Sequence, residues 1–221
     1  MDFGKIVGDS FEYAKEGLVG KWMKWVLLII SCIIFPLIMG YMMRIYRGAT
    51  PSPEPDNWGG MFIDGIKLFV VGLIYAIPII ILELVVLGSA GIAMFISAAA
   101  PTPDPGAILN LLGAVLFGMV VLAVVAVVIG LIVATAYVRF ARTGSFSEAF
   151  NFGAIFAHIG KIGIVHYIIA LIIMGVIVGI IEIICTLIPV IGMLLLVILM
   201  PFLVLFSARY LTLLYDSEGT A

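Results

Sequence analysis

Long apolar runs alternate with short polar segments along this chain of 221 residues. Several runs match or exceed the roughly 20 residues that a helix needs to cross a bilayer. They lie at 22–43, 66–100, 107–138, 161–187 and 193–214. The pattern predicts an all-α, polytopic integral membrane protein, with residues 1–221 forming a single membrane domain.

The polar segments after the first and third runs resemble each other. Each begins with two arginines three residues apart and leads to a lysine at the start of the next run. The first elbow comprises residues 44–65 with Arg44 and Arg47, and the second elbow comprises residues 139–160 with Arg139 and Arg142. An even number of spans separates the elbows, so both face the same side. We interpret the chain as two parallel repeat units.

The N-terminal segment 3–19 predicts an interfacial amphipathic helix. Its apolar positions recur at helical spacing: Phe3, Val7, Phe11, Ala14 and Leu18. A second interfacial helix is expected in the second elbow, where Ser145 and Glu148 have the spacing of a capping box.

The first run allows two topologies, because Pro36 lies near its middle. If residues 22–43 cross once, the chain has five spans and the N-terminal helix faces away from the elbows. If they form a re-entrant hairpin, four spans remain and all 11 basic residues share one side. Length favours one crossing, whereas the positive-inside rule favours the hairpin. We predict about five spans, with the elbows and C-terminus cytoplasmic and the protein in the plasma membrane.

Composition narrows the class further. Hydrophobic residues make up 64% of the chain and charged residues 11%, and the mean hydropathy is +1.32. A soluble domain is about half apolar and a quarter charged. The net charge of −2 does not suit nucleic-acid binding. Cys32 and Cys185 lie apart within apolar runs, which indicates neither a disulfide nor a zinc site.

Two carboxylates are the main candidates for intramembrane chemistry. Glu83 and Glu182 lie within apolar runs of corresponding helices in the two repeat units. A buried membrane carboxylate often marks an ion or proton path, so a small transporter or channel is one interpretation. The alternative is that both reach water at the outer interface or cap contacts between helices.

No catalytic constellation stands out. His158 and His166 have no third ligand at metal spacing, and the chain has no HExxH, GxSxG or nucleotide-binding motif. We expect a protein that is not an enzyme and that uses no cofactor and no metal. Arg44, Arg47, Arg139 and Arg142 are candidate contacts for membrane lipid head groups.

Small residues line parts of several runs, including Gly175 with Gly179, Gly130 with Ala134, and Gly88 with Gly91. Such faces let helices approach closely in lipid. They indicate either packing within the chain or a homo-oligomer. The functional expectation is a scaffold that engages lipid or partner proteins, with a transporter that uses Glu83 at the repeat interface as the alternative.

The first elbow resembles a known family. The resemblance rests on Gly40-Tyr41, the paired arginines, Asp56-Asn57-Trp58, Asp64-Gly65-Ile66-Lys67 and Tyr75-Ala76-Ile77-Pro78. This order is similar to the prokaryotic multi-pass membrane family catalogued as domain of unknown function 4013. The resemblance implies an integral membrane protein and supplies no activity, cofactor or catalytic residue.

Overall fold

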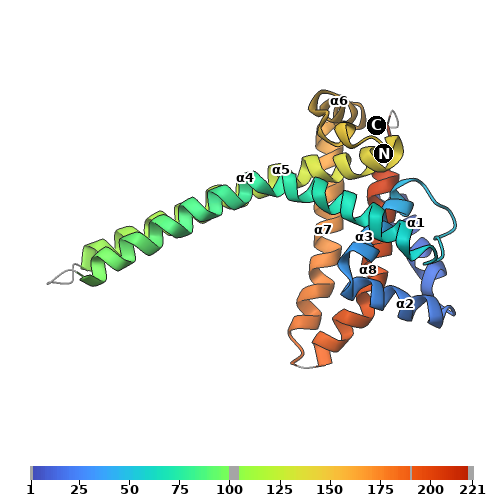
Figure 1. Cartoon of the computed structure of the whole chain (residues 1–221), viewed down its shortest axis with the longest axis horizontal. Coiled ribbons are helices and arrows are strands. Elements are labelled where there is room, and N and C mark those ends of the chain that lie inside the picture. Colours follow the sequence, from blue (N-terminus) through green and yellow to red (C-terminus); the bar gives the residue numbers. More distant parts are fainter. Residues whose placement is uncertain (1, 100–104, 190, 219–221) are drawn as a thin grey trace. The chain divides into compact units, whose positions relative to one another are not determined.

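The computed structural model describes residues 2–99, 105–189 and 191–218. Within these ranges the chain is helical and has no strand. The elements are α1 Phe3–Leu18, α2 Trp22–Ile33, α3 Phe35–Tyr46, α4 Trp58–Ala99, α5 Pro105–Thr143, the 3₁₀ helix η1 Phe146–Phe150, α6 Phe152–Ile162, α7 Ile164–Thr186 and α8 Ile191–Asp216 (Figure 1). The proline-rich segment 101–106 between the second and third apolar runs, where a turn is expected, lies mostly outside the described residues.

Two compact units make up the chain. The first contains the residues up to Val71 and those from Ala134 onward, and the second is Gly72–Val133. Among the residues that the structure describes, four helices are long and apolar enough to cross a membrane, namely α4, α5, α7 and α8. The number rises to five if α2 and α3 together count as one span. This count confirms the predicted all-α polytopic class.

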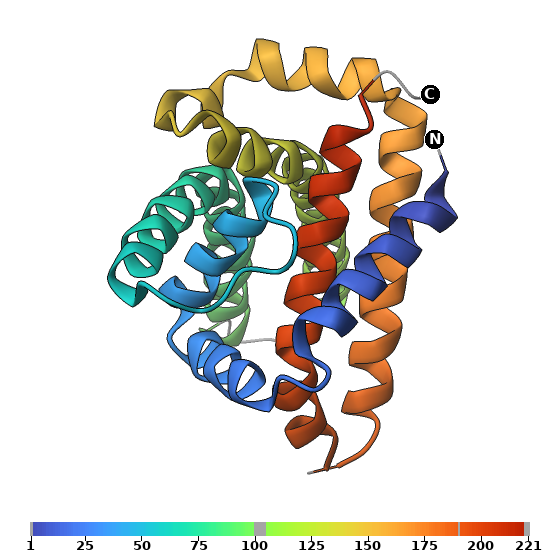
Figure 2. The ribbon, with the colours of Figure 1, turned by 90° about the vertical axis from the view of Figure 1, so that its right-hand side faces the viewer.

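The first unit is built around α8, which contacts α1, α2, α3 and α7 (Figure 2). Because neighbours surround it, α8 buries residues on several sides, among them Leu205, Tyr210 and Thr212. The Tyr210 hydroxyl donates to the Ala170 carbonyl of α7 at 2.8 Å, and the Thr212 hydroxyl donates to the Ala208 carbonyl of its own helix at 2.8 Å. Buried hydroxyls thus have acceptors, as a low-dielectric interior requires.

Helix α1 packs along α8, but its buried side differs in part from the prediction. Ala14 and Leu18 are fully buried as expected, whereas Phe11 is 51% exposed. Tyr13 is buried instead, and its hydroxyl donates to the Ala49 carbonyl at 3.0 Å. The contact beyond the helix therefore decides which face turns inward.

Helices α2 and α3 are separated by a sharp bend of 120° at Ile34. Pro36 lies in the first turn of α3, where its missing N–H costs nothing. The same ring could not extend α2, because it would clash with the carbonyl four residues earlier. The proline therefore ends one helix and begins the next.

Helices α3 and α4 cross within the first unit at two glycines. A Cβ on Gly40 would lie 1.8 Å from the Met61 carbonyl oxygen, and one on Gly65 would lie 1.7 Å from the Pro36 carbonyl oxygen. No side chain fits either place, so the two backbones touch directly. The crossing fixes the start of α4 against α3.

The second unit pairs the later part of α4 with the earlier part of α5. A Cβ on Gly118 would lie 2.6 Å from a Val86 methyl carbon, so the two helices are in close contact there. Beside this contact runs an apolar groove of about 410 Å³, whose lining includes Val86, Ser89 and Gly118. Much of the apolar surface of this unit is exposed, as expected for a hairpin that faces lipid.

Candidate functional site: the two elbows

The backbone conformation at two residues determines where the loop of the first elbow begins and ends. Helix α3 ends at Tyr46, and Gly48 has φ +93°, a value that favours glycine. The proline loop, residues 48–57, then runs to Asn57, whose φ of +45° is tolerated by asparagine. The Asn57 Oδ1 accepts from the Gly60 N–H at 3.2 Å and so caps the first turn of α4.

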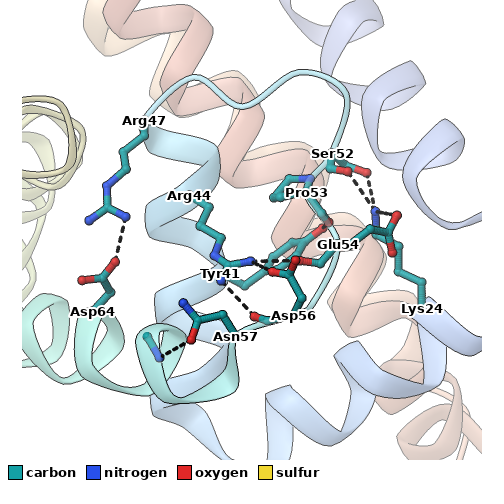
Figure 3. A network of polar contacts seen from close by, with 11 residues as sticks. Lys24, Tyr41, Arg44, Arg47, Ser52, Pro53, Glu54, Asp56, Asn57 and Asp64 are labelled. Atoms are coloured by element: carbon teal, nitrogen blue, oxygen red, sulfur yellow. Dashed lines mark hydrogen bonds and ion pairs between the residues drawn. The ribbon is translucent and has the colours of Figure 1, made fainter.

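A buried lysine holds the middle of the proline loop (Figure 3). Lys24 of α2 is 4% exposed, and its ammonium donates to the Ser52 carbonyl at 3.0 Å and to the Ser52 hydroxyl at 2.8 Å. It also lies 3.4 Å from the Glu54 carboxylate. These acceptors use the three donors of the ammonium. The Lys24 ammonium therefore holds the proline loop in place and has no donor left for another ligand.

Helix α3 holds the loop from the other side. The Tyr41 hydroxyl donates to the Pro53 carbonyl at 2.7 Å. Arg44 donates to the Glu54 carbonyl at 2.9 Å and forms an ion pair with Asp56 at 2.5 Å. A second nitrogen of Arg44 donates to the Asp56 carbonyl at 2.9 Å. The planar guanidinium thus binds three acceptors in the same loop.

The N-terminal helix also contacts this loop. The Tyr13 hydroxyl that donates to Ala49 lies under Arg209 of α8, whose Cζ is 5.0 Å from the Tyr13 ring centroid. Burial raises the pKa of Tyr13 to about 12, although the nearby Arg209 charge opposes the shift. The phenol therefore stays protonated and remains a hydrogen-bond donor at physiological pH.

The second arginine of each elbow reaches a different helix. Arg47 binds the Asp64 carboxylate of α4 at 2.7 Å. Arg142 binds the Asp216 carboxylate of α8 at 2.6 Å, and its Nε donates to the Tyr46 carbonyl at 2.7 Å. Arg142 thus satisfies a carbonyl at the end of α3 and ties it to the end of α8.

The second elbow does not contain the predicted capping box. Ser145 makes no side-chain cap, and residues 146–150 form a 3₁₀ helix. Glu148 pairs instead with Arg139, and Asn151 caps α6 by accepting from the Ala154 N–H at 3.2 Å. Hydrogen bonds from Arg139 and then Asn151 lower the pKa of Glu148. An arginine nine residues upstream therefore outcompetes the local backbone for this carboxylate.

The C-terminal segment is attached to α6. The His158 ring stacks on Tyr215 with centroids 3.8 Å apart, and its Nε2 lies 2.9 Å from the Tyr215 carbonyl oxygen. Its Nδ1 is 3.1 Å from the Glu218 carboxylate, which also pairs with Lys161. The hydrogen bond from Lys161 is the main reason that the pKa of Glu218 is lowered. These contacts hold the chain end next to the second elbow.

A family model described as "Protein of unknown function (DUF4013)" matches residues 25–190. The chain belongs to this family. No curated protein and no solved structure matches. The match confirms the family that the first elbow indicated and extends it over most of the helices.

In this DUF4013 protein the four predicted arginines are each paired with a carboxylate of the same chain. Glu83 and Glu182 behave differently. Both are exposed, neither forms an ion pair within the described ranges, and Glu83 does not line the apolar groove of the second unit. They belong to different units, Glu83 to the second and Glu182 to the first.

His158 and His166 are likewise in different settings. His158 binds the C-terminal segment, and His166 lies 6.2 Å from the Phe3 ring in a stacked arrangement. Among the described residues no group of three His, Cys, Asp or Glu side chains could hold a metal ion.

The predicted small-residue faces are open. A Cβ on Gly88, Gly91, Gly130, Gly175 or Gly179 would meet no atom within 4 Å. Close packing occurs instead at Gly40, Gly65 and Gly118, which the sequence did not single out as contacts. Gly40 and Gly65 do stand in the stretch that carries the family resemblance, which was the available signal.

Lys24 is the other important residue that the sequence did not reveal. Its neighbours Trp22 and Trp25 are typical of a membrane interface and give no sign that the ammonium is buried. Its ammonium is buried because the proline loop, 28 residues away, folds over it. Only the tertiary contact distinguishes this lysine from the exposed Lys21.

Proposed function

We propose that this DUF4013 protein is a non-enzymatic membrane scaffold whose elbow side engages lipid head groups or partner proteins. The observation that supports this proposal is the internal pairing of all four elbow arginines. Catalytic and transport sites keep polar groups available in a concave pocket. Here the four arginines instead bind carboxylates and carbonyls of the same chain. These bonds hold the loops and helix ends in place, so the elbow side is a rigid surface.

The orientation follows from charge and belongs to the same proposal. Both elbows are rich in arginine, whereas the described part of the 188–192 turn has no basic residue. Under the positive-inside rule the elbow side faces the cytoplasm, with the protein in the plasma membrane. The unfilled glycine faces are the surfaces on which a second copy or another membrane helix would pack.

The two elbows also support the proposed internal repeat. In each, the first arginine binds a carboxylate in the following segment, Asp56 in one case and Glu148 in the other. In each, the second arginine binds a carboxylate on a helix that follows later in the chain, Asp64 or Asp216. The first and second arginines of one elbow therefore make the same kinds of ion pair as the first and second arginines of the other.

Transport is the second candidate function, and Glu83 is the observation that favours it. A carboxylate exposed on an apolar helix is costly in hydrocarbon unless it faces water, an ion or a partner. If protons or cations moved along α4, the Glu83 carboxylate would be the group on that helix that binds them.

Reconstitution separates the two candidates. We would measure proton and K⁺ flux in liposomes containing the wild type, Glu83→Gln or Glu182→Gln, with empty liposomes as the reference. The scaffold proposal expects all three proteins to match empty liposomes. Flux in the wild type that Glu83→Gln abolishes would overturn it in favour of transport.

A second measurement tests the engagement of lipid directly. The thermal unfolding midpoint of the protein would be compared in nanodiscs of phosphatidylcholine alone and in discs that also contain phosphatidylglycerol. We expect the midpoint to rise with the anionic lipid, because ligands that bind the native state stabilise it. An unchanged midpoint would argue against head-group binding and leave proteins as the partners to be sought.

A further inference from the structure

Arg209 of α8 differs from the four elbow arginines, because no carboxylate of the described chain pairs with it. Within the described ranges it forms no hydrogen bond either, and its Nε is buried without an acceptor. One face of its guanidinium is covered by the Tyr13 ring, whose centroid is 5.0 Å from Cζ. A cation–π contact uses that face and leaves the N–H donors, which lie in the plane of the group, without oxygen acceptors.

Arg209 lines a cavity of about 400 Å³ between α1, the proline loop and α8. On the α1 side the lining carboxylates are Asp9, Glu12 and Glu16, which share one face of the helix because they are three and four residues apart. Glu12 is paired with Lys15 at 3.1 Å, whereas Asp9 and Glu16 form no ion pair among the described residues. The cavity thus contains one unpaired cation together with unpaired carboxylates.

This mixture of charges selects the class of ligand. A simple anion would be attracted by Arg209 but repelled by the α1 carboxylates, and a simple cation would be repelled by Arg209. A zwitterion avoids both penalties. Phosphate is well matched to a guanidinium, which binds it through paired hydrogen bonds, and an ammonium with N–H donors is matched to a carboxylate. The cavity therefore suits a head group that contains a phosphate and an ammonium.

Arg209 also has the position along α8 that a lipid phosphate requires. Residues 191–208 contain no charged side chain, so Arg209 is the first charge after an apolar stretch. Basic residues at the end of such a stretch lie at the membrane interface. Toward the apolar end of α8, Phe11 packs against Phe202 with ring centroids 5.3 Å apart and is itself 51% exposed. These rings give an acyl chain an apolar surface beside the cavity.

Asp9 lies on the elbow side of Arg209. Besides this cavity it lines a second one with Leu213 and Asp216, which are four and seven residues further along α8. At about 1.5 Å per residue these positions are about 6–10 Å beyond Arg209. The amine of a phospholipid likewise lies on the water side of its phosphate. The direction from Arg209 to Asp9 therefore matches the direction from phosphate to amine.

We propose that this cavity binds the head group of an aminophospholipid, with phosphatidylethanolamine as its simplest form. Arg209 donates to the phosphate oxygens, and the primary ammonium donates to the Asp9 carboxylate. Phosphatidylcholine binds less well because its trimethylammonium has no N–H to donate, and phosphatidylglycerol binds less well because it carries no cation. The inference deepens the proposed engagement of lipid head groups and rests on it.

Unfolding midpoints in nanodiscs test the selectivity. The discs contain phosphatidylcholine alone, or phosphatidylcholine mixed equally with phosphatidylethanolamine or with phosphatidylglycerol. We expect the wild-type midpoint to be about 2–4 °C higher with phosphatidylethanolamine than with phosphatidylcholine alone. A midpoint that rises with phosphatidylglycerol but not with phosphatidylethanolamine would refute this inference and leave the proposed function in place. A midpoint that responds to neither lipid would count against both.

A soluble compound separates a lipid ligand from a free one. Phosphoethanolamine carries the same two charged groups without acyl chains. Added in solution to discs of phosphatidylcholine, it should leave the midpoint unchanged, because it lacks the apolar contact beside the cavity. A rise as large as that from phosphatidylethanolamine would overturn the assignment to a lipid.

Two variants locate the response. Each is compared with itself in the two kinds of disc, so a change in its overall stability does not enter the comparison. We expect Arg209→Gln and Asp9→Asn each to lose at least half of the shift with phosphatidylethanolamine. Asp9 is exposed, so its variant keeps the test open even if Arg209→Gln does not fold. Lys21→Gln is the matched control, because it removes an exposed charge that does not line the cavity, and it should keep the full shift. A full shift in Asp9→Asn, or its loss in Lys21→Gln, would overturn the site.

Discussion

The carbonyl oxygen of Met61 on α4 occupies the space where a side chain on Gly40 of α3 would begin, 1.8 Å from the position of its Cβ. Gly65 and the Pro36 carbonyl repeat the relationship in the other direction at 1.7 Å. The two helices therefore meet backbone to backbone, an arrangement that gains dispersion contacts where glycine removes the Cβ. It also positions Asp64, next to Gly65, for its ion pair with Arg47.

Gly40→Ala should destabilise the protein strongly. The new methyl group meets main-chain atoms of α4, which cannot rotate away, so the helices must separate. We expect a loss of about 2–4 kcal/mol in the free energy of unfolding, at or above the upper end for overpacked sites. Thermal or denaturant unfolding in detergent micelles measures it.

Gly8→Ala is the matched control for this change. It lies inside α1 with no atom within 4 Å of its Cβ position. Alanine should stabilise that helix by about 0.5–1 kcal/mol. A Gly40→Ala protein as stable as Gly8→Ala would show that α3 and α4 do not pack at this distance.

Arg142 should couple the end of α3 to the end of α8. Arg142→Lys keeps the charge but cannot reach the Tyr46 carbonyl and the Asp216 carboxylate with one planar group. Because the side chains of Arg142 and Asp216 are both partly exposed, we expect it to lower the unfolding free energy by only about 1 kcal/mol. A double-mutant cycle of Arg142→Gln with Asp216→Asn measures the ion-pair share of this energy. Additivity of the two single changes within about 0.3 kcal/mol would contradict the pairing.

Acid should weaken the second elbow through Glu148. The pKa of this carboxyl is lowered in the folded protein from an ordinary 4.5, so the folded state favours the ionised form. Its stabilising contribution is present above the ordinary value and is lost as pH falls from there through the lowered value. Wild-type protein should therefore show a falling unfolding midpoint between about pH 5 and pH 3.

Glu148→Gln should remove part of this pH dependence. We expect a lower midpoint at neutral pH and a shallower decline in acid, measured by scanning fluorimetry. Glu16→Gln, which removes an exposed carboxylate of α1, serves as the control and should follow the wild-type curve. A Glu148→Gln profile parallel to the wild type would assign the acid sensitivity to other groups.

Hydropathy was sufficient to predict the fold class, because the free energy of transferring a side chain into the membrane depends mainly on that side chain and little on its neighbours. The apolar runs therefore predicted the helices of the bilayer, and the order of residues in the first elbow predicted the family. The prediction did not extend to which polar atoms meet. Lys24 is an example, because it is buried only where the proline loop, distant in sequence, folds over it.

Local motifs were unreliable where a long-range partner competed for the same group. The spacing of Ser145 and Glu148 fits a capping box, yet Arg139 takes the carboxylate. Phe11 has the right helical position to be buried, but Tyr13 is drawn inward by the Ala49 carbonyl. In both cases a charged or hydroxyl group found a stronger partner outside its own helix, which periodicity does not register.

The anchored proline loop has an energetic consequence for recognition. A flexible loop that folds onto its partner must give up about 1–2 kcal/mol of backbone conformational entropy for each residue that becomes ordered. In this loop, bonds to Lys24, Tyr41 and Arg44 have already removed that freedom, and alternate prolines limit what remains. A ligand that docks here meets a preorganised surface, so most of its contact energy is retained as affinity.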